Sequence, residues 1–101
     1  MNRFEELNNR SIEWAKAKGI FEHGTDIGQA SKTIEEANEL FDAVWRKHKE
    51  DQIDAIGDIL VCITVMAKRL ELDILDCFEI ALNVIEARSG KMSNGQFFKD
   101  K

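Results

Sequence analysis

The chain has 101 residues, of which 44% are hydrophobic and 33% charged, and its formal net charge is −5 at pH 7. This length fits one small domain, so residues 1–101 are treated as a single unit. The acidic balance argues against binding of nucleic acid through phosphate contacts, although a bound divalent cation would still admit a phosphate-bearing substrate.

The first two predicted helices follow from apolar residues that recur every three or four positions. One helix runs from about Asn2 to Lys18 and ends before Gly19, a residue that favours a left-handed C-terminal cap. The next runs from about Ile27 to Lys49 and begins after a cap at Thr25 or Asp26. Its apolar stripe is typical of a packed helix face and consists of Ile27, Ala30, Ile34, Ala37, Phe41 and Val44.

A polar turn at His48–Gln52 leads to a third predicted helix at Ile53–Glu71. Between Ala55 and Ala67 this helix is apolar on almost every side, and three other short helices can hardly cover it. We therefore expect a homodimer or homotetramer formed through this helix. The longest apolar run in it, Ile59 to Ala67, is too short to span a membrane, so no membrane partner is expected.

The fourth predicted helix runs from about Ile74 to Arg88, with Asp73 as its N-cap and Gly90 at its end. The tail, residues 91–101, is mostly polar, and we expect it to pack loosely or on a partner. No segment alternates convincingly as a strand. The sequence therefore predicts an all-α fold: a four-helix bundle-like protomer with a central helical hairpin.

The two cysteines, Cys62 and Cys77, lie in apolar helical stretches without nearby histidines. They are interpreted as small buried side chains rather than zinc ligands. We expect them to be reduced and the protein to be cytoplasmic. The N-terminal segment lacks the apolar stretch of a signal peptide.

Two groups of acidic residues are candidates for a functional site rather than for a solvated helix surface. Glu36 and Glu39 are three residues apart on one helix face beside the apolar stripe, and Glu35 lies further round. Taken alone, this spacing also fits a charged helix surface. Asp58 lies in the apolar third helix, where a carboxylate is costly unless it is paired or binds a metal. A buried salt bridge to Lys32 or Arg88 is the structural alternative.

An antiparallel pairing of the second and third helices would bring Glu36 and Glu39 opposite Asp54 and Asp58. Carboxylate oxygens from facing helices form a hard-ligand site, which suits Mg²⁺ or Mn²⁺ better than zinc. Such a site leaves room for water and phosphate oxygens, as hydrolysis of a phosphate chain requires.

These residues resemble a family. The segment Gln29-x-x-Lys32-x-x-Glu35-Glu36-x-x-Glu39, followed by Asp54-Ala-Ile-Gly-Asp58, is similar to the MazG-like all-α nucleoside triphosphate pyrophosphohydrolases, whose pattern is EExxE and then ExxD. The ending Asn83-x-x-x-x-Arg88-x-Gly90-Lys91-Met92 and the earlier Trp14-Ala-x-x-Lys18-Gly19 also resemble the small members. One departure stands out, because the first acid of ExxD falls at Ala55.

The resemblance implies Mg²⁺-dependent cleavage of nucleoside triphosphates to monophosphate and pyrophosphate, in homo-oligomers that clear unwanted nucleotides. It implies that Glu36, Glu39 and Asp58 bind the metal, while either Asp54 or a water takes the place of the missing acid. Glu35 would be an accessory acid, and Glu35 or Glu39 would accept the proton of the attacking water. The residues implied to meet the substrate are Lys32, Arg88 and Lys91 at the phosphates, Asn83 beside them, and Trp14 against the base. Packing of Trp14 in the core is the structural alternative for that residue.

Two other functions fit the same pattern. Ala55 favours a non-catalytic helical module that binds a nucleotide or a protein without turnover. A phosphoribosyl-ATP pyrophosphohydrolase, from a related family on a shared helical scaffold, is a second enzymatic alternative, although the short chain and its tail argue against it.

Overall fold

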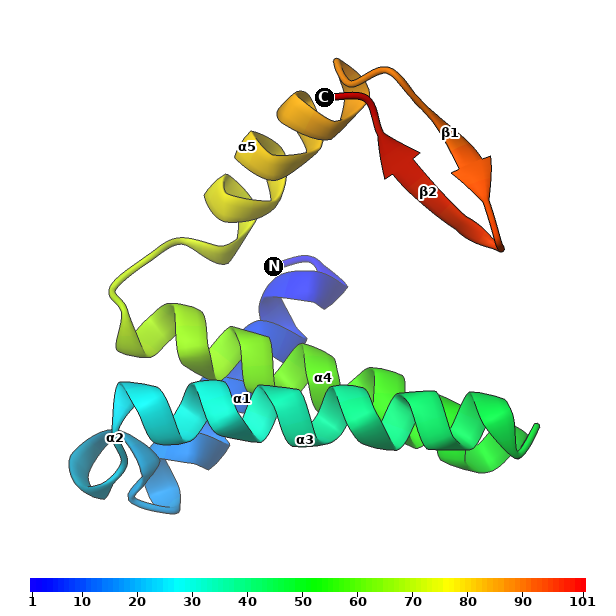
Figure 1. Cartoon of the computed structure of the whole chain (residues 1–101). Coiled ribbons are helices and arrows are strands. Elements are labelled where there is room, and N and C mark those ends of the chain that lie inside the picture. Colours follow the sequence, from blue (N-terminus) through cyan, green and yellow to red (C-terminus); the bar gives the residue numbers. More distant parts are fainter.

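The computed structural model describes residues Met1–Lys101 and confirms the all-α prediction (Figure 1). Its elements in chain order are α1 (Arg3–Ala17), α2 (Ile20–His23), α3 (Asp26–Trp45), α4 (Lys49–Arg69), α5 (Ile74–Glu86), β1 (Gly90–Ser93) and β2 (Gln96–Lys99). The structure has one helix more than the four predicted. The additional helix is α2, a single short turn between α1 and α3. None of the helices is long and apolar enough to cross a membrane.

The predicted helix caps are largely confirmed. Gly19 follows α1 with a φ of 77°, in the left-handed region that costs glycine little. The side chain of Thr25 accepts a hydrogen bond from the backbone N–H of Gly28 at the start of α3. Asp73 caps α5 in the same way, through the N–H of Asp76. Polar residues just before each apolar run therefore set where α3 and α5 begin.

The turn between α3 and α4 lies earlier than predicted. Helix α3 ends at Trp45 and α4 begins at Lys49, so His48–Gln52 is not a turn but the cap and first turn of α4. Lys47 takes a φ of 56°, which reverses the chain without a glycine. The side chain of His48 then accepts a hydrogen bond from the N–H of Asp51. This tight turn makes α3 and α4 the predicted antiparallel hairpin (Figure 1).

The prediction that no strand forms was wrong for the tail. Strands β1 and β2 pair antiparallel, with Met92 opposite Phe97 and Ser93 opposite Gln96. The turn between them has positive φ angles at Asn94 (49°) and Gly95 (79°), the backbone geometry that Asn-Gly favours in hairpins. Helix α5 accordingly ends at Glu86, and Gly90 begins a strand rather than ending the helix.

The small core lies along the α3–α4 hairpin, against which α1 packs. Ala43 of α3, Ala55 and Val65 of α4, and Ala15 of α1 are almost fully buried. Gln29 ties the two central helices together, because its side-chain amide donates a hydrogen bond to the carbonyl of Cys62. Cys62 is buried as expected, whereas Cys77 is exposed, because no residue of α5 is buried.

The apolar stripe predicted as the packed face of α3 does not face α4. Glu36 and Ala43, on a neighbouring face, are the residues of α3 that are buried. The large members of the predicted stripe are more than half exposed: Ile27 (79%), Ile34 (64%), Phe41 (71%) and Val44 (57%). The period was correct, but periodicity does not say which of two adjacent faces meets the partner within the chain.

Candidate active site

Three carboxylates converge between α3 and α4. Glu36 and Glu39 lie one turn apart on α3, and Asp58 lies opposite them on α4. Each offers an oxygen, and these oxygens all lie within 4.8 Å of one another. The tight turn at Lys47 makes this possible, since it sets the two helices side by side in opposite directions. The structure thus brings together the three acids that the sequence placed at a metal site.

The electrostatics of this cluster favour a bound cation. Glu36 is only 8% exposed, and its buried Oε2 has no hydrogen-bond partner. Burial, then the hydrogen bonding and charge of Glu39, then the charge of Asp58 raise the pKa of Glu36. The pKa of Asp58 is also raised, first by burial and then by the charges of Asp54 and Glu39. A divalent cation would satisfy the orphaned oxygen and offset the repulsion.

No ion pair involves Asp58, so the salt bridge considered above, to Lys32 or Arg88, is absent. A structural pairing therefore does not explain this partly buried carboxylate. Its environment is acidic, and its neighbours are other carboxylates rather than cations. This strengthens the interpretation of Asp58 as a ligand.

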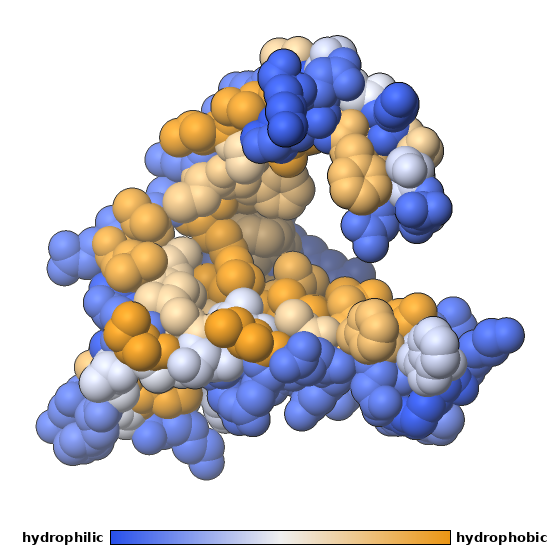
Figure 2. Space-filling model, viewed as in Figure 1, coloured by the Kyte–Doolittle hydropathy of each residue, from blue (hydrophilic) through white to orange (hydrophobic).

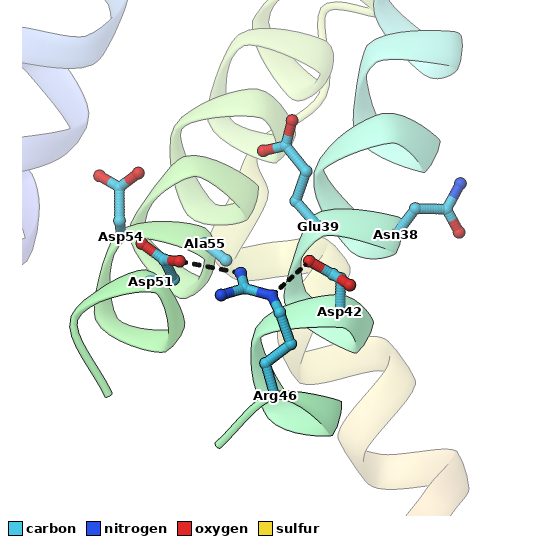
Figure 3. A pocket seen from close by; sticks show the side chains of 7 residues that line it. All are labelled: Asn38, Glu39, Asp42, Arg46, Asp51, Asp54 and Ala55. Carbon is cyan, nitrogen blue, oxygen red and sulfur yellow. Dashed lines mark hydrogen bonds and ion pairs between the residues drawn. The ribbon is translucent and has the colours of Figure 1, made fainter. Parts of the chain in front are cut away.

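Asp54 and Ala55 occupy different positions beside the cluster. Asp54 lies one turn before Asp58 and acts on its pKa, but it is not among the three converging acids. Ala55 is 4% exposed and lies between α3 and α4, where its methyl group faces the groove that holds Glu39. Figure 3 shows the Asp54 side chain on the outer side of α4, away from Glu39. The residue that faces the groove at the first position of the ExxD pattern is therefore an alanine, Ala55, and not an acid.

A cavity of about 410 Å³ opens next to the carboxylates, toward the turn between α3 and α4 (Figure 3). Arg46 crosses it and donates hydrogen bonds of 2.8 Å to both Asp42 of α3 and Asp51 of α4. These carboxylates raise the pKa of Arg46, and Arg46 holds the pKa of Asp51 below its usual range. Glu39, Asp54, Ala55 and Asn38 complete the lining.

Glu35 and Lys32 form an exposed pair beside the cluster. Their charged atoms are 3.6 Å apart, and both side chains are more than half exposed. The charge of Lys32 is the one influence that lowers the pKa of Glu36, so this cation acts on the buried carboxylate as well. Lys32 is therefore close enough to influence an anion bound at the site, whereas Glu35 lies toward solvent.

The remaining predicted substrate residues lie elsewhere in the protomer. Asn83 is on α5, Arg88 follows it, and Lys91 is in β1, and none of these lines the cavity or joins the carboxylates. Figure 1 shows α5 and the β1–β2 hairpin rising away from α3. Trp14 is half exposed on α1 and lines neither feature. A single protomer thus gathers the metal-binding side of the predicted site, without its basic side.

Sequence reasoning missed two arginines. The spacing of Asp42 and Arg46, four residues apart on a helix, is a signal from which that pair could be predicted, whereas no spacing indicates the second bond to Asp51. Arg69 is 11% exposed at its side chain and binds the carbonyls of Ile20 and Gly24 together with Asp26. It anchors the α1–α3 connection to the end of α4, a contact between distant segments that no local pattern announces.

The model of the phosphoribosyl-ATP pyrophosphohydrolase family matches the chain over residues 4–83. The matched region contains all three converging carboxylates and ends within α5, before the β1–β2 hairpin. No curated protein and no solved structure matches the chain.

Proposed function

The chain belongs to the phosphoribosyl-ATP pyrophosphohydrolase family, and we propose on this premise that it is an Mg²⁺-dependent enzyme that releases pyrophosphate from a nucleotide triphosphate. The observation that carries the metal assignment is the buried, unpartnered Oε2 of Glu36 within 4.8 Å of two further carboxylates. Oxygen ligands of this kind suit Mg²⁺, with Mn²⁺ as a substitute.

In this proposal Glu36, Glu39 and Asp58 hold the cation between α3 and α4, and Asp54 supports them from the next turn. A cation held by these residues would offset the negative charge of the phosphate chain and would lower the pKa of a water bound to it. Glu39, exposed and lining the cavity, is better placed than Glu35 to accept the proton of that water, because Glu35 is paired with Lys32 at the surface. Lys32 would bind a phosphate oxygen beside the carboxylates. Arg88 and Lys91 at the phosphates, Asn83 beside them and Trp14 on the base would require an assembly that brings these residues to the site, since none of them lies there in one protomer.

Two substrate classes fit this chemistry. The family match favours phosphoribosyl-ATP, which carries a triphosphate that can release pyrophosphate. The segment beyond residue 83, with Arg88, Lys91 and the Asn94-Gly95 turn, lies outside the match and resembles small MazG-like enzymes that act on nucleoside triphosphates. In both cases the bond broken lies between the α- and β-phosphates, so one assay covers both.

A non-catalytic nucleotide-binding module is the rival function, and Ala55 is the residue that favours it. The test is pyrophosphate release with Mg²⁺ from a panel of ribo- and deoxynucleoside triphosphates and phosphoribosyl-ATP. We expect turnover of at least one substrate. We also expect Glu36→Gln and Asp58→Asn to lower kcat/KM by about a hundredfold or more, because loss of a residue that merely supports a metal ligand already costs about 10- to 100-fold. Glu50→Gln, an exposed acid on α4, is the matched control.

Binding of Mg²⁺ and nucleotide without product from any substrate would establish the module instead. Activity that survives both Glu36→Gln and Asp58→Asn would place the chemistry elsewhere. We further propose that the enzyme acts in the cytoplasm as a homo-oligomer assembled through α4, with no nucleic-acid or membrane partner.

A further inference from the structure

The groove between α3 and α4 continues beyond the carboxylate cluster toward the turn that joins the two helices. Glu39 belongs to both parts, because it converges with Glu36 and Asp58 and also lines the cavity of about 410 Å³. Glu36 is more than nine-tenths buried, and its unpartnered Oε2 marks the end of the groove where a cation is needed. The cavity therefore lies next to the place where a phosphate chain would meet the metal, and its volume is that of a small-molecule site.

The lining of this cavity is polar and acidic. Ala55 is its one hydrophobic residue, and four carboxylates against one guanidinium, that of Arg46, give the lining a net charge of −3. This charge repels further phosphate groups. No aromatic residue lines the cavity, so it offers a nucleobase no ring on which to stack. Figure 2 shows that the end of the molecule around the α3–α4 turn is mostly hydrophilic, whereas apolar side chains gather between α5 and the α3–α4 pair. The cavity therefore suits an uncharged group that is rich in hydrogen-bond donors.

Arg46 fixes two of these carboxylates on opposite walls of the cavity (Figure 3). Its Nε donates a hydrogen bond to Oδ2 of Asp42 on α3, and its Nη2 donates one to Oδ2 of Asp51 on α4. His48 also contacts Oδ2 of Asp51, so Oδ1 of each aspartate is left without a partner from the protein. Because Arg46 already orders both side chains, a hydroxyl group that donates to these free oxygens costs little further side-chain entropy.

We propose that this cavity holds the ribose of the substrate, and that Asp42 and Asp51, positioned by Arg46, accept hydrogen bonds from its 2′- and 3′-hydroxyl groups. The inference rests on the proposed function, because it takes the phosphate chain to lie at the carboxylate cluster. The sugar of a nucleotide is bonded through its 5′-oxygen to the α-phosphate, so it is the next group along from that chain. Acceptance of a hydrogen bond from the ribose 2′-hydroxyl by an acidic residue is an established means of nucleotide recognition. The substrate class is therefore ribonucleotides, and 2′-deoxyribonucleotides are poor substrates.

The first test compares each ribonucleoside triphosphate with its 2′-deoxy counterpart in the pyrophosphate-release assay with Mg²⁺. We expect kcat/KM to be about ten- to a hundredfold higher for the ribonucleotide of each pair, which is the factor that one hydrogen bond to a charged group provides. Equal kcat/KM for the two sugars, or a preference that follows the base and not the sugar, would overturn the inference and leave the proposed function intact.

Binding gives a readout that does not need turnover. In calorimetric titrations with MgCl₂, AMP should bind about tenfold more tightly than 2′-deoxy-AMP. Equal affinity of the two monophosphates, or no binding of either, would overturn the inference whether or not the protein is an enzyme. Absence of product from every nucleotide would refute the proposed function instead, and the AMP comparison would still decide whether the cavity recognises ribose.

Two variants assign this recognition to the side chains. Asp42→Ala removes one acceptor, and Arg46→Met leaves both carboxylates in the cavity but no longer fixes them. Each should bring the ratio of ribonucleotide to deoxyribonucleotide close to one, in kcat/KM and in AMP affinity, whereas a mere loss of stability would lower both members of a pair equally. Lys49→Met, at an exposed cation in the first turn of α4 outside the cavity, should keep the wild-type ratio. A wild-type ratio in both Asp42→Ala and Arg46→Met would exclude these residues from sugar recognition.

Discussion

Replacing Glu36 with glutamine should change thermal stability in opposite directions with and without metal. In EDTA the wild-type chain holds a buried carboxylate with an orphaned oxygen beside two further acids. The introduced glutamine would be neutral there, and its amide N–H groups could donate to the carboxylates of Glu39 and Asp58. Relief of one unsatisfied buried polar group is worth about 1–3 kcal/mol. For a domain of this size each kcal/mol shifts Tm by about 4–8 °C, so Glu36→Gln should melt higher in EDTA.

Saturating Mg²⁺ should reverse this order. A ligand at a thousandfold its Kd stabilises the folded state by about 4.1 kcal/mol, which exceeds the advantage of about 1–3 kcal/mol, and only the wild-type chain has the intact ligand set. Calorimetry of both proteins in EDTA and in MgCl₂ measures the inversion. Glu35→Gln, at an exposed residue on the same helix, should shift Tm little and keep the full Mg²⁺ response. If the two proteins keep the same Tm order in both buffers, Glu36 does not bind the metal.

The same variant should also show a characteristic dependence on pH in EDTA. The folded-state pKa of Glu36 is raised, mainly by burial, so protonation favours the folded state. The stability that the protonated group contributes is complete below the pKa of the unfolded chain, about 4.3, and is lost as pH rises through the folded-state value. The advantage of Glu36→Gln should therefore vanish in acid and grow toward neutral pH, as urea unfolding can measure. An advantage that stays constant across this range would refute the electrostatic explanation.

Three further predictions concern other residues. Ala55→Glu should lower the Tm in EDTA, because it buries a charge. The same variant should bind Mg²⁺ about tenfold more tightly by calorimetric titration, which is a gain of about 1.4 kcal/mol in binding free energy. Unchanged affinity would show that position 55 does not reach the metal. Arg69→Met should destabilise the chain by about 2–4 kcal/mol in urea unfolding, because it removes the hydrogen bonds of a largely buried guanidinium to the carbonyls of Ile20 and Gly24 and to Asp26. It should leave Mg²⁺ affinity unchanged. In a dimer where the C-terminal segment (α5, β1 and β2) carries Arg88 to the partner's site, inactive Glu36→Gln and Arg88→Ala chains should complement each other. Random assortment makes about half of the dimers mixed, each with one intact site of two, so mixing should restore about a quarter of wild-type activity. No recovery after verified subunit exchange would exclude action across the dimer.

The helices and their starting points could be predicted because they depend on local chemistry. Thr25 and Asp73 can cap only the helices that follow them. Glu36 and Glu39 share a face because helical spacing places them there, and Asp58 was conspicuous among apolar neighbours. Asn94-Gly95, flanked by Met92 and Phe97, is also a local signal that favours a β-hairpin, although the tail around it is mostly polar.

Contacts across the chain could not be predicted in this way. The turn at Lys47 has no glycine or proline to mark it, so the helix boundary was placed several residues late. The stripe through Ile34 and Phe41 is apolar and periodic, as predicted, but it is exposed in the protomer rather than packed. Periodicity measures how much surface must be covered, and it carries no information on whether the covering residues come from the same molecule.

This distinction divides the proposed function between two levels of structure. The carboxylates Glu36, Glu39 and Asp58 converge through a short turn and an intramolecular hairpin, so metal binding needs one folded protomer and should survive dissociation. Arg88 and Lys91 follow α5 in the C-terminal segment, which makes little contact with α1, α3 and α4 of the same protomer. Their position relative to the metal is therefore set only when this segment packs on a partner subunit. Mg²⁺ affinity should therefore be independent of protein concentration, whereas kcat/KM should fall on dilution below the dimer Kd. A parallel loss of both would mean that the hairpin itself requires the partner to form.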